Sequence, residues 1–452
     1  MRLSSLNMRG SVAAAAIEQL QPARWEGHIA AASGRGAEIL GLAHHLSLGD
    51  RLRVHGRRGL SAAAEIIAVH GDAAQAMMFA PVEGLGVGTL ASAPIDARPA
   101  DLAVSDAWLG RVVDALGCPL DSGPPLLAGQ HPRRVRTPPP GATRRMRLGE
   151  RASLGIRVLD LFTTCRHGQR IGLFAGSGVG KSTLLAMLVR HVACDLSVIA
   201  LVGERGREVR EFLEDDLGEA GLARSVVVVA TSDTSPLMRR EAAYAAMTIA
   251  EHFRDCGKNV LLLMDSVTRF CHALREIALS AGEPPASRGY PPSVFAELPR
   301  LLERAGPGVE GTVPMGQITA FISVLVDGDD HNEPIADSVR GLLDGHVFLD
   351  RRIAERGRYP AVDVARSLSR AVPGCNDAAE NELAAKGRQI LATYADVEDL
   401  VRLGAYRTGS DAAVDEALIV APRIEAMLQQ DRNERTDLPD AFIQLKLAMR
   451  ER

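Results

Sequence analysis

The sequence has 452 residues, of which 46% are hydrophobic and 24% are charged, and its formal net charge is -4. This length allows two or three domains with cores of their own, and the composition is typical of a soluble globular protein. The slightly acidic balance argues against strong attraction of the whole chain to nucleic acid or to anionic lipid.

Cysteine usage and hydropathy indicate a cytoplasmic protein. The six cysteines form no CxxC pair and no Cys/His cluster with metal-ligand spacing, so we expect reduced core thiols. No apolar run reaches the roughly 18 residues that a membrane helix needs. Arg2 and Arg9 precede the apolar stretch 12–17, but Glu18 ends that stretch too early for a signal peptide. The cysteines are Cys118, Cys165, Cys194, Cys256, Cys271 and Cys375.

The first hundred residues predict an arm followed by a small β domain. Residues 1–23 predict a helical arm, because SVAAAAIEQL is rich in helix formers and stops before Pro22. From 24 to 95, short apolar runs are separated by glycine and aspartate turns at intervals of about ten residues, which predicts a small β-barrel or sandwich. The alanine-rich runs weaken this prediction, since alanine is a poor strand former.

We expect a central domain over residues 96–376. HPRRVRTPPPG at 131–141 predicts a surface connection, since successive prolines fit neither a helix interior nor a central strand. Beyond it, apolar β-branched runs alternate with helical stretches such as 236–253 and 268–279, the pattern of a parallel sheet covered on both faces. The expected strands are 171–174, 196–202, 226–229, 260–264 and 318–326.

Residues 377–452 predict a small helical C-terminal domain, because the strand pattern stops after Pro373. The helical pattern divides this region into four helices. They are expected at 377–395, 397–403, 411–429 and 439–449.

The segment IGLFAGSGVGKSTLL at 171–185 has the pattern of a phosphate-binding loop between a buried strand and a helix. Its glycines let successive N–H groups turn toward the phosphates of ATP, and the helix N-terminus adds partial positive charge. Lys181 adds a full charge, and the Ser182 hydroxyl is placed to ligate Mg²⁺. Ala175 replaces the first glycine of the usual pattern. The expected nucleotide-binding residues are Ala175, Gly176, Ser177, Gly178, Val179, Gly180, Lys181, Ser182 and Thr183.

Two carboxylates complete the predicted site. Asp265 follows the apolar run 260–264, at the carboxyl end of a strand, and we expect it to help hold Mg²⁺ beside the phosphate loop. Glu204 follows the expected strand 196–202 and is the candidate to orient the attacking water. The residues alone equally allow Glu204 to belong to an exposed charge cluster over 204–214.

The phosphate loop AGSGVGKST, the segment GERGREVREF and the strand LLLMDSVTRF resemble those of one family, the catalytic subunits of rotary ATP synthases and the related type III protein-export ATPases. The likeness covers nearly the whole chain. Its most specific segments are GEPPASRGYPPSVFAELPRLLERAG at 282–306, GDDHNEPIAD, and PAVDVARSLS at 360–369. The resemblance implies an α/β fold with a RecA-like P-loop core between an N-terminal β-barrel and a helical C-terminal domain. It also implies a homohexamer that hydrolyses Mg-ATP.

The resemblance implies roles for individual residues as well. Lys181 binds phosphate, Glu204 is the catalytic carboxylate, and Arg205 lies near the γ-phosphate. Arg370 corresponds to an arginine finger that reaches the nucleotide of the adjacent subunit, a device that contributes ~10³–10⁵ in turnover. Tyr359 corresponds to an aromatic residue that stacks on adenine. Two plainer interpretations stay open: Tyr359 as a core residue, and Arg370 paired with a structural acid.

Within the family, the sequence favours export over ATP synthesis and the flagellar branch over the virulence injectisome. The acidic, rotor-contacting tract of synthase subunits is not found, since DAAENELAAK at 377–386 is only weakly acidic. GPGVEGTVPMGQITA, GRYPAVDV and SRAVPGC resemble the flagellar branch most. The implied partners are a regulatory, stator-like protein at the N-terminal arm, a membrane export gate and chaperone–substrate complexes, with docking at the inner membrane.

Two other classes of motor remain as alternatives. A rotary ATP synthase subunit would need a homologous noncatalytic companion chain. An RNA-translocating ring motor would need a basic, aromatic face on the barrel. Trp25 and Phe79 are the only aromatic residues among the first hundred, so we expect neither base stacking there nor a nucleic-acid partner.

Overall fold

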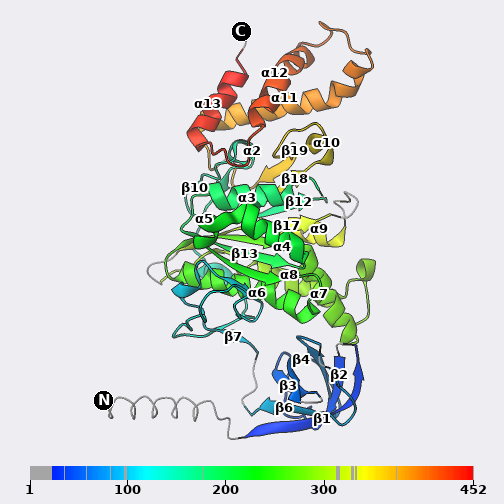
Figure 1. Cartoon of the computed structure of the whole chain (residues 1–452). Helices are drawn as coiled ribbons and strands as arrows, with labels where there is room; N and C mark the ends of the chain where they lie inside the picture. Colours follow the sequence, from blue (N-terminus) through cyan, green and yellow to red (C-terminus); the bar gives the residue numbers. More distant parts are fainter. Residues whose placement is uncertain are drawn as a thin grey trace, which may run out of the picture. The chain divides into compact units, whose positions relative to one another are not determined.

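The computed structural model describes residues 23–34, 36–56, 59–81, 83–95, 99–176, 178–311, 316–326, 330, 333–372 and 374–450 (Figure 1). The chain forms two compact units. The first contains the N-terminal residues up to Ala100 with two short segments, Ser235–Leu237 and Glu276–Glu283, and the second contains the rest. The helical arm predicted for residues 1–23 lies, up to Pro22, outside the described residues.

The first unit contains a closed six-stranded β-barrel, as predicted. Its strands follow the order β1-β2-β5-β4-β3-β6, and β6 pairs with β1. Ala64, Ala74, Ala76 and Ala91 are fully buried inside it. A barrel of so few strands has a narrow interior, so small side chains fill it although alanine is a poor strand former. The strands are β1 (Arg24–Ser33), β2 (Gly36–Leu40), β3 (Arg51–His55), β4 (Ser61–His70), β5 (Ala73–Met78) and β6 (Leu90–Pro94).

A nine-stranded sheet forms the centre of the second unit. Its strand order is β19-β18-β12-β17-β15-β13-β14-β8, with β16 pairing beside β17. The strands from β18 to β8 run parallel, and β19 is antiparallel at the edge. All five expected strands are present. The strands are β8 (Val112–Asp114), β12 (Arg170–Ala175), β13 (Leu196–Val202), β14 (Ser225–Ala230), β15 (Asn259–Asp265), β16 (Gly306–Pro307), β17 (Gln317–Leu325), β18 (Gly345–Leu349) and β19 (Val362–Ser369).

Helices cover both faces of this sheet. In β13, Ile199 and Leu201 join the hydrophobic cluster that contains α2, α3 and the C-terminal helices, whereas Val198 and Ala200 are buried on the opposite face. Such burial on both faces is the reason why the strands are continuously apolar. The longer helices are α2 (Arg157–Phe162), α3 (Lys181–His191), α4 (Gly206–Glu211), α5 (Gly218–Ala223), α6 (Pro236–Asp255), α7 (Val267–Ser280), α8 (Pro292–Leu302), α9 (Pro334–Leu342) and α10 (Arg351–Glu355).

Short elements connect the larger ones. A π-helical turn, η4, continues α4, and the 3₁₀ turns η2, η3 and η5 lie in connections. Two small two-stranded sheets join β7 to β9 and β10 to β11. The bounds are η2 (Asp106–Trp108), η3 (Ala142–Arg144), η4 (Phe212–Leu217), η5 (Ser287–Gly289), β7 (Asp101–Leu102), β9 (Arg133–Arg134), β10 (Arg151–Ala152) and β11 (Cys165–Arg166).

The C-terminal region is helical, as predicted, but its described residues form three helices rather than the four expected: α11 (Ala378–Arg402), α12 (Ala412–Leu428) and α13 (Leu438–Ala448). The expected break between 377–395 and 397–403 is wrong, because no glycine or proline stands there to interrupt the helix. Asp377 and Glu380 form a capping box at the start of α11. No helix in the described parts of the chain is both long and apolar enough to cross a membrane.

The proline-rich segment 131–141 was predicted as a surface connection, and this is correct only in part. β8 precedes the segment in sequence and already belongs to the central sheet. Val135, inside the segment, is buried, and its carbonyl accepts a hydrogen bond of 2.6 Å from Arg304. Proline excludes a helix but leaves neighbouring carbonyls free to satisfy a buried donor, so the segment contributes to the core.

Arg304 is one of the largest fully buried side chains. It follows α8 and contacts Glu251 of α6 through two bonds of 3.0 and 2.6 Å, and it also donates to the Thr248 hydroxyl at 3.0 Å. With the Val135 carbonyl, these contacts join the proline-rich segment, α6 and the end of α8 around one cation. A buried charge is tolerated only where its partners are this complete.

Arg304→Ala should lower the free energy of unfolding by about 3–5 kcal/mol, because Glu251 then remains buried and unpaired. Urea unfolding followed by circular dichroism measures this loss. Arg300→Ala, in α8, is the matched control: its ion pair with Glu297 leaves the arginine 65% exposed, and we expect a loss below about 1 kcal/mol. Equal losses for the two variants would contradict the role given to Arg304.

Candidate functional site

The phosphate-binding loop has the geometry that its sequence predicts. β12 ends at Ala175 and α3 begins at Lys181. Gly178 and Gly180 have φ angles of 78° and 89°, in the left-handed region that glycine favours. No side chain caps the start of α3, so its first N–H groups are available to an anion. Gly176, Val179, Ser182 and Thr183 lie along this turn, whereas the predicted Ser177 lies outside the described residues.

Four parallel strands bring the charged side chains of the site together. β12, β17, β15 and β13 are consecutive neighbours, so their carboxyl ends share one edge of the sheet. Lys181 follows β12, Asp265 ends β15, and Glu204 follows β13. The Lys181 Nζ forms an ion pair with the Asp265 carboxylate and lies 3.8 Å from Glu204 Oε1. Strand order therefore assembles a lysine and two carboxylates from distant parts of the sequence.

Asp265 is buried and held in one orientation. Ser323 lies on β17, between β12 and β15. Its hydroxyl donates a 2.5 Å hydrogen bond to Asp265 Oδ1. Lys181 contacts the same oxygen. The sequence carried no signal for Ser323, because a serine inside an apolar strand becomes informative only when the neighbouring strand is known.

Glu204 is enclosed rather than part of an exposed charge cluster. Its side chain is 16% exposed, while that of Glu211 in the following helix is 52% exposed. Burial, together with the nearby negative charge of Asp265, raises the pKa of Glu204 to about 7 against the opposing effect of Lys181. Glu204 Oε1 is buried without a hydrogen-bond partner among the residues that the structure describes. A buried acceptor of this kind, directed at a phosphate loop, fits a site that a ligand or water completes.

Tyr359 lies beside the phosphate loop of the same chain. A Cβ at Gly180 would lie 3.1 Å from the Tyr359 ring, so glycine lets the ring approach without being displaced. Tyr359 is 41% exposed and therefore is not a core residue. Both residues line a cavity of about 340 Å³, which is large enough for a nucleobase. Its walls are Gly180, Thr183, Leu184, Met187, Tyr359, Pro360, Gln429, Gln430, Asp431 and Arg432.

The two remaining predicted arginines lie apart from this cluster. Arg205 is 81% exposed and pairs with Glu208 at 3.4 Å. Arg370 follows β19, and its backbone N–H donates to the Asp344 carbonyl, at the amino end of β18. The six residues of β12 separate that end of the sheet from the phosphate loop by roughly 17 Å. Arg370 is exposed, and no ion pair of its side chain is found within the described ranges.

Known proteins show strong similarity to this fold and sequence. The model of the ATP synthase alpha/beta family, nucleotide-binding domain, matches residues 155–369, and that of the T3SS EscN ATPase C-terminal domain matches 377–447. A flagellum-specific ATP synthase of Caulobacter vibrioides is 51% identical over 433 residues, covering 95% of this chain and 96% of the relative. The chain belongs to the ATP synthase alpha/beta family. As a member of this family it is an ATPase, so its substrate is a nucleotide.

Secretion ATPases of this family share the whole architecture. A type 3 secretion system ATPase of Xanthomonas euvesicatoria is 48% identical over 386 residues, covering 85% of this chain and 86% of the relative. The structure of the assembled ATPase EscN, from the type III secretion system of enteropathogenic E. coli, matches with a TM-score of 0.84 and 38% identity. The match covers 94% of this chain and 100% of EscN. The predicted family resemblance and fold are therefore confirmed.

One group of potential metal ligands lies elsewhere in the family fold. Asp106, His252 and Cys256 place one ligand atom each within 4.8 Å of one another, although Asp106 and Cys256 are exposed. His252 lies in α6 and Cys256 follows four residues later, directly after the helix, a spacing that differs from CxxC. Asp106 joins them only through the fold. We assign this group no role in the ATPase.

Proposed function

We propose that this chain is the ATPase of a bacterial flagellar type III protein-export apparatus, which hydrolyses Mg-ATP as a homohexamer. The observation that supports hydrolysis most is the convergence of Lys181, Asp265 and Glu204 beside the phosphate loop. The flagellar assignment is supported by relatives named flagellum-specific ATP synthase in Caulobacter vibrioides and, at 47% identity, in Bacillus subtilis.

The donor groups beside the loop suit a magnesium ion. Mg²⁺ prefers hard oxygen ligands and keeps several waters. The Ser182 hydroxyl and the Asp265 carboxylate are of this type, and we assign them to the metal, Asp265 acting through water. Bound there, Mg²⁺ would neutralise charge on the β- and γ-phosphates. Lys181 would exchange its contact with Asp265 for one with the phosphate oxygens, because the phosphates carry more negative charge than one carboxylate.

Glu204 has the properties of the group that orients the attacking water. It follows β13 at the sheet edge where the phosphate loop lies, and its Oε1, which has no hydrogen-bond partner among the described residues, is available to accept a proton or a hydrogen bond. A carboxylate with a pKa near the working pH is an efficient base. We assign Arg205, the next residue, to the γ-phosphate. Its exposed side chain would rotate toward the phosphate when ATP binds.

Arg370 is assigned to the nucleotide of an adjacent subunit. It lies at the opposite end of the sheet from the phosphate loop, too far for its side chain to reach the loop of its own chain. A ring in which each subunit offers one face to its neighbour supplies the arginine in trans. EscN, solved as an assembled ATPase, supports such a ring.

The export role implies partners beyond the ring. We assign a regulatory, stator-like protein to the N-terminal arm, and a membrane export gate and chaperone–substrate complexes to the assembled motor. The protein would then be cytoplasmic and peripheral at the inner membrane when docked. The virulence injectisome is the second candidate, favoured by the Xanthomonas euvesicatoria relative. EscN has also been solved in complex with its central stalk EscO.

The activity should depend on pH through Glu204. Because the raised pKa is about 7, protonation below that pH removes the base, and kcat/KM should fall about tenfold per unit below it. Glu204→Gln should lower kcat by at least about 100-fold while ADP binding persists. Its residual rate should lack the acidic limb. A wild-type kcat/KM that stays flat from about pH 6 to 8 would contradict this role.

Deletion of the gene tests the export role separately from the chemistry. We expect non-motile cells that lack filaments and secrete no flagellar subunits, with recovery by the wild-type gene but not by Lys181→Ala. Normal swimming together with loss of another secreted set would favour the injectisome instead. Copurification of a homologous second subunit in equal amount would favour a rotary synthase.

A further inference from the structure

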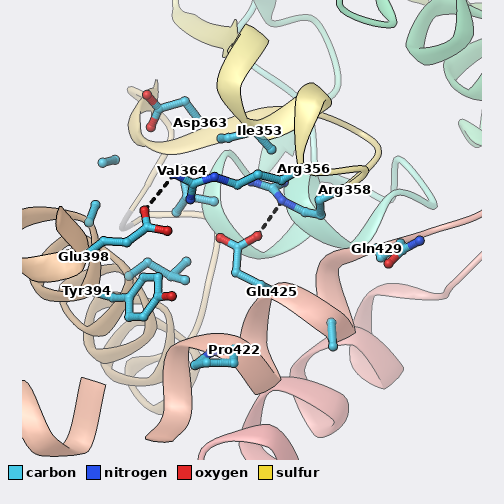
Figure 2. Close-up of a pocket in the computed structure, with 14 residues that line it drawn as sticks. Ile353, Arg356, Arg358, Asp363, Val364, Tyr394, Glu398, Pro422, Glu425 and Gln429 are labelled. Atoms are coloured by element: carbon cyan, nitrogen blue, oxygen red, sulfur yellow. Dashed lines mark ion pairs between the residues drawn. The ribbon is translucent and has the colours of Figure 1, made fainter. Parts of the chain in front are cut away.

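Two ion pairs connect the C-terminal helices with the catalytic sheet around a cavity of about 400 Å³ (Figure 2). Arg358 Nε lies 2.6 Å from the Glu425 carboxylate on α12, and Arg356 Nη2 lies 2.7 Å from that of Glu398 on α11. The pairs are alike in chemistry but not in surroundings. The side chain of Arg358 is 7% exposed, whereas that of Arg356 is 48% exposed.

Arg358 holds the backbone on the far side of its neighbour, Tyr359. Its Nη1 donates to the Pro360 carbonyl and its Nη2 to the Val362 carbonyl, both at 2.9 Å. The Arg358 side chain thus bonds to the backbone that follows Tyr359, the residue whose ring lies against Gly180. An arginine can make these two bonds and an ion pair at once because its donors form a fixed fork, which a lysine lacks.

The C-terminal region also contacts Tyr359 from the other side. The N–H of Gln430, just after α12, donates to the Tyr359 carbonyl at 2.8 Å. Gln430 is buried and donates in turn to the carbonyls of Gly155 and Glu434, while its Oε1 accepts from the N–H of Arg157. The wall of the 340 Å³ cavity that faces Tyr359 is therefore firmly attached to α2.

We infer that Arg358 is a positioning residue for Tyr359, and that Glu425 holds Arg358 in place. The C-terminal helices would thereby set the affinity of the ATPase for the adenine base. Glu425 lies one helical turn before Gln429, the first of the residues 429–432 that line the 340 Å³ cavity. This inference rests on the proposed role of Tyr359 as the adenine platform.

Glu425 is the point at which the arrangement can be weakened without damage to the core. Its side chain is 38% exposed and lines the open 400 Å³ cavity, so its truncation removes little packing from the core. Arg358, in contrast, would keep a buried charge without its partner, an unfavourable state that rotation of the side chain toward solvent relieves. That rotation breaks the bonds to Pro360 and Val362, so the Tyr359 segment is held only by its remaining contacts, such as the bond from Gln430.

The test compares Glu425→Ala with Glu398→Ala. For Glu425→Ala we expect KM for ATP and Kd for ADP to rise about tenfold, with kcat within about twofold of wild type. Glu398→Ala removes the neighbouring pair, which does not contact Tyr359, and both constants should stay within about twofold. Arg358→Lys should behave like Glu425→Ala. Thermal melting of each variant verifies that the fold is intact.

Three outcomes would overturn the inference: an unchanged KM for Glu425→Ala, an equal rise in both alanine variants, or a loss confined to kcat. Tyr359→Ala separates the inference from the proposed function. If Tyr359→Ala raises KM and Glu425→Ala does not, the link to the C-terminal helices is wrong while the adenine platform stands. If Tyr359→Ala leaves KM unchanged, the adenine role itself is wrong.

Discussion

The chemistry of this protein depends on one topological constraint, the shared carboxyl edge of four adjacent parallel strands. The phosphate loop leaves β12, Ser323 stands on β17, Asp265 ends β15 and Glu204 follows β13. Parallel strands joined by helical crossovers have their carboxyl ends at the same edge of the sheet. Residues that are far apart in the sequence therefore meet there. The contacts of Lys181 with both carboxylates are the result.

The same constraint determines the electrostatics of the site. Burial of Glu204, together with the nearby negative charge of Asp265, outweighs the effect of the single lysine and raises the pKa of Glu204 to about 7. It also determines what the site lacks. The antiparallel strand β19 carries Arg370 to the opposite end of the sheet, away from the loop of its own chain. If Arg370 has the role proposed above, a complete site needs a second subunit, and the solved assembly of the relative EscN is consistent with that proposal.

Features encoded by short, local patterns could be predicted from the sequence. The loop glycines, Lys181 and the positions of Asp265 and Glu204 after apolar strands all follow from such patterns, whereas Arg370 and Tyr359 came from family resemblance. Features that depend on tertiary packing could not be predicted. The barrel accepts alanine because its interior is narrow. The burial of Val135 goes with the hydrogen bond that its carbonyl accepts from Arg304. Gln430 belongs to no sequence motif, because its hydrogen bonds form only when the segment after α12 meets the start of α2.

The most direct measurement of the shared-site account is complementation between two inactive variants assembled into the same rings. Glu204→Gln subunits retain Arg370, and Arg370→Ala subunits retain Glu204, so a random equal mixture restores about a quarter of the interfaces. The account predicts that ATPase activity returns in the mixture to about that fraction of wild type. It stays absent when either variant is mixed with the double variant. A mixture that forms normal rings but remains as inactive as its components would contradict the account.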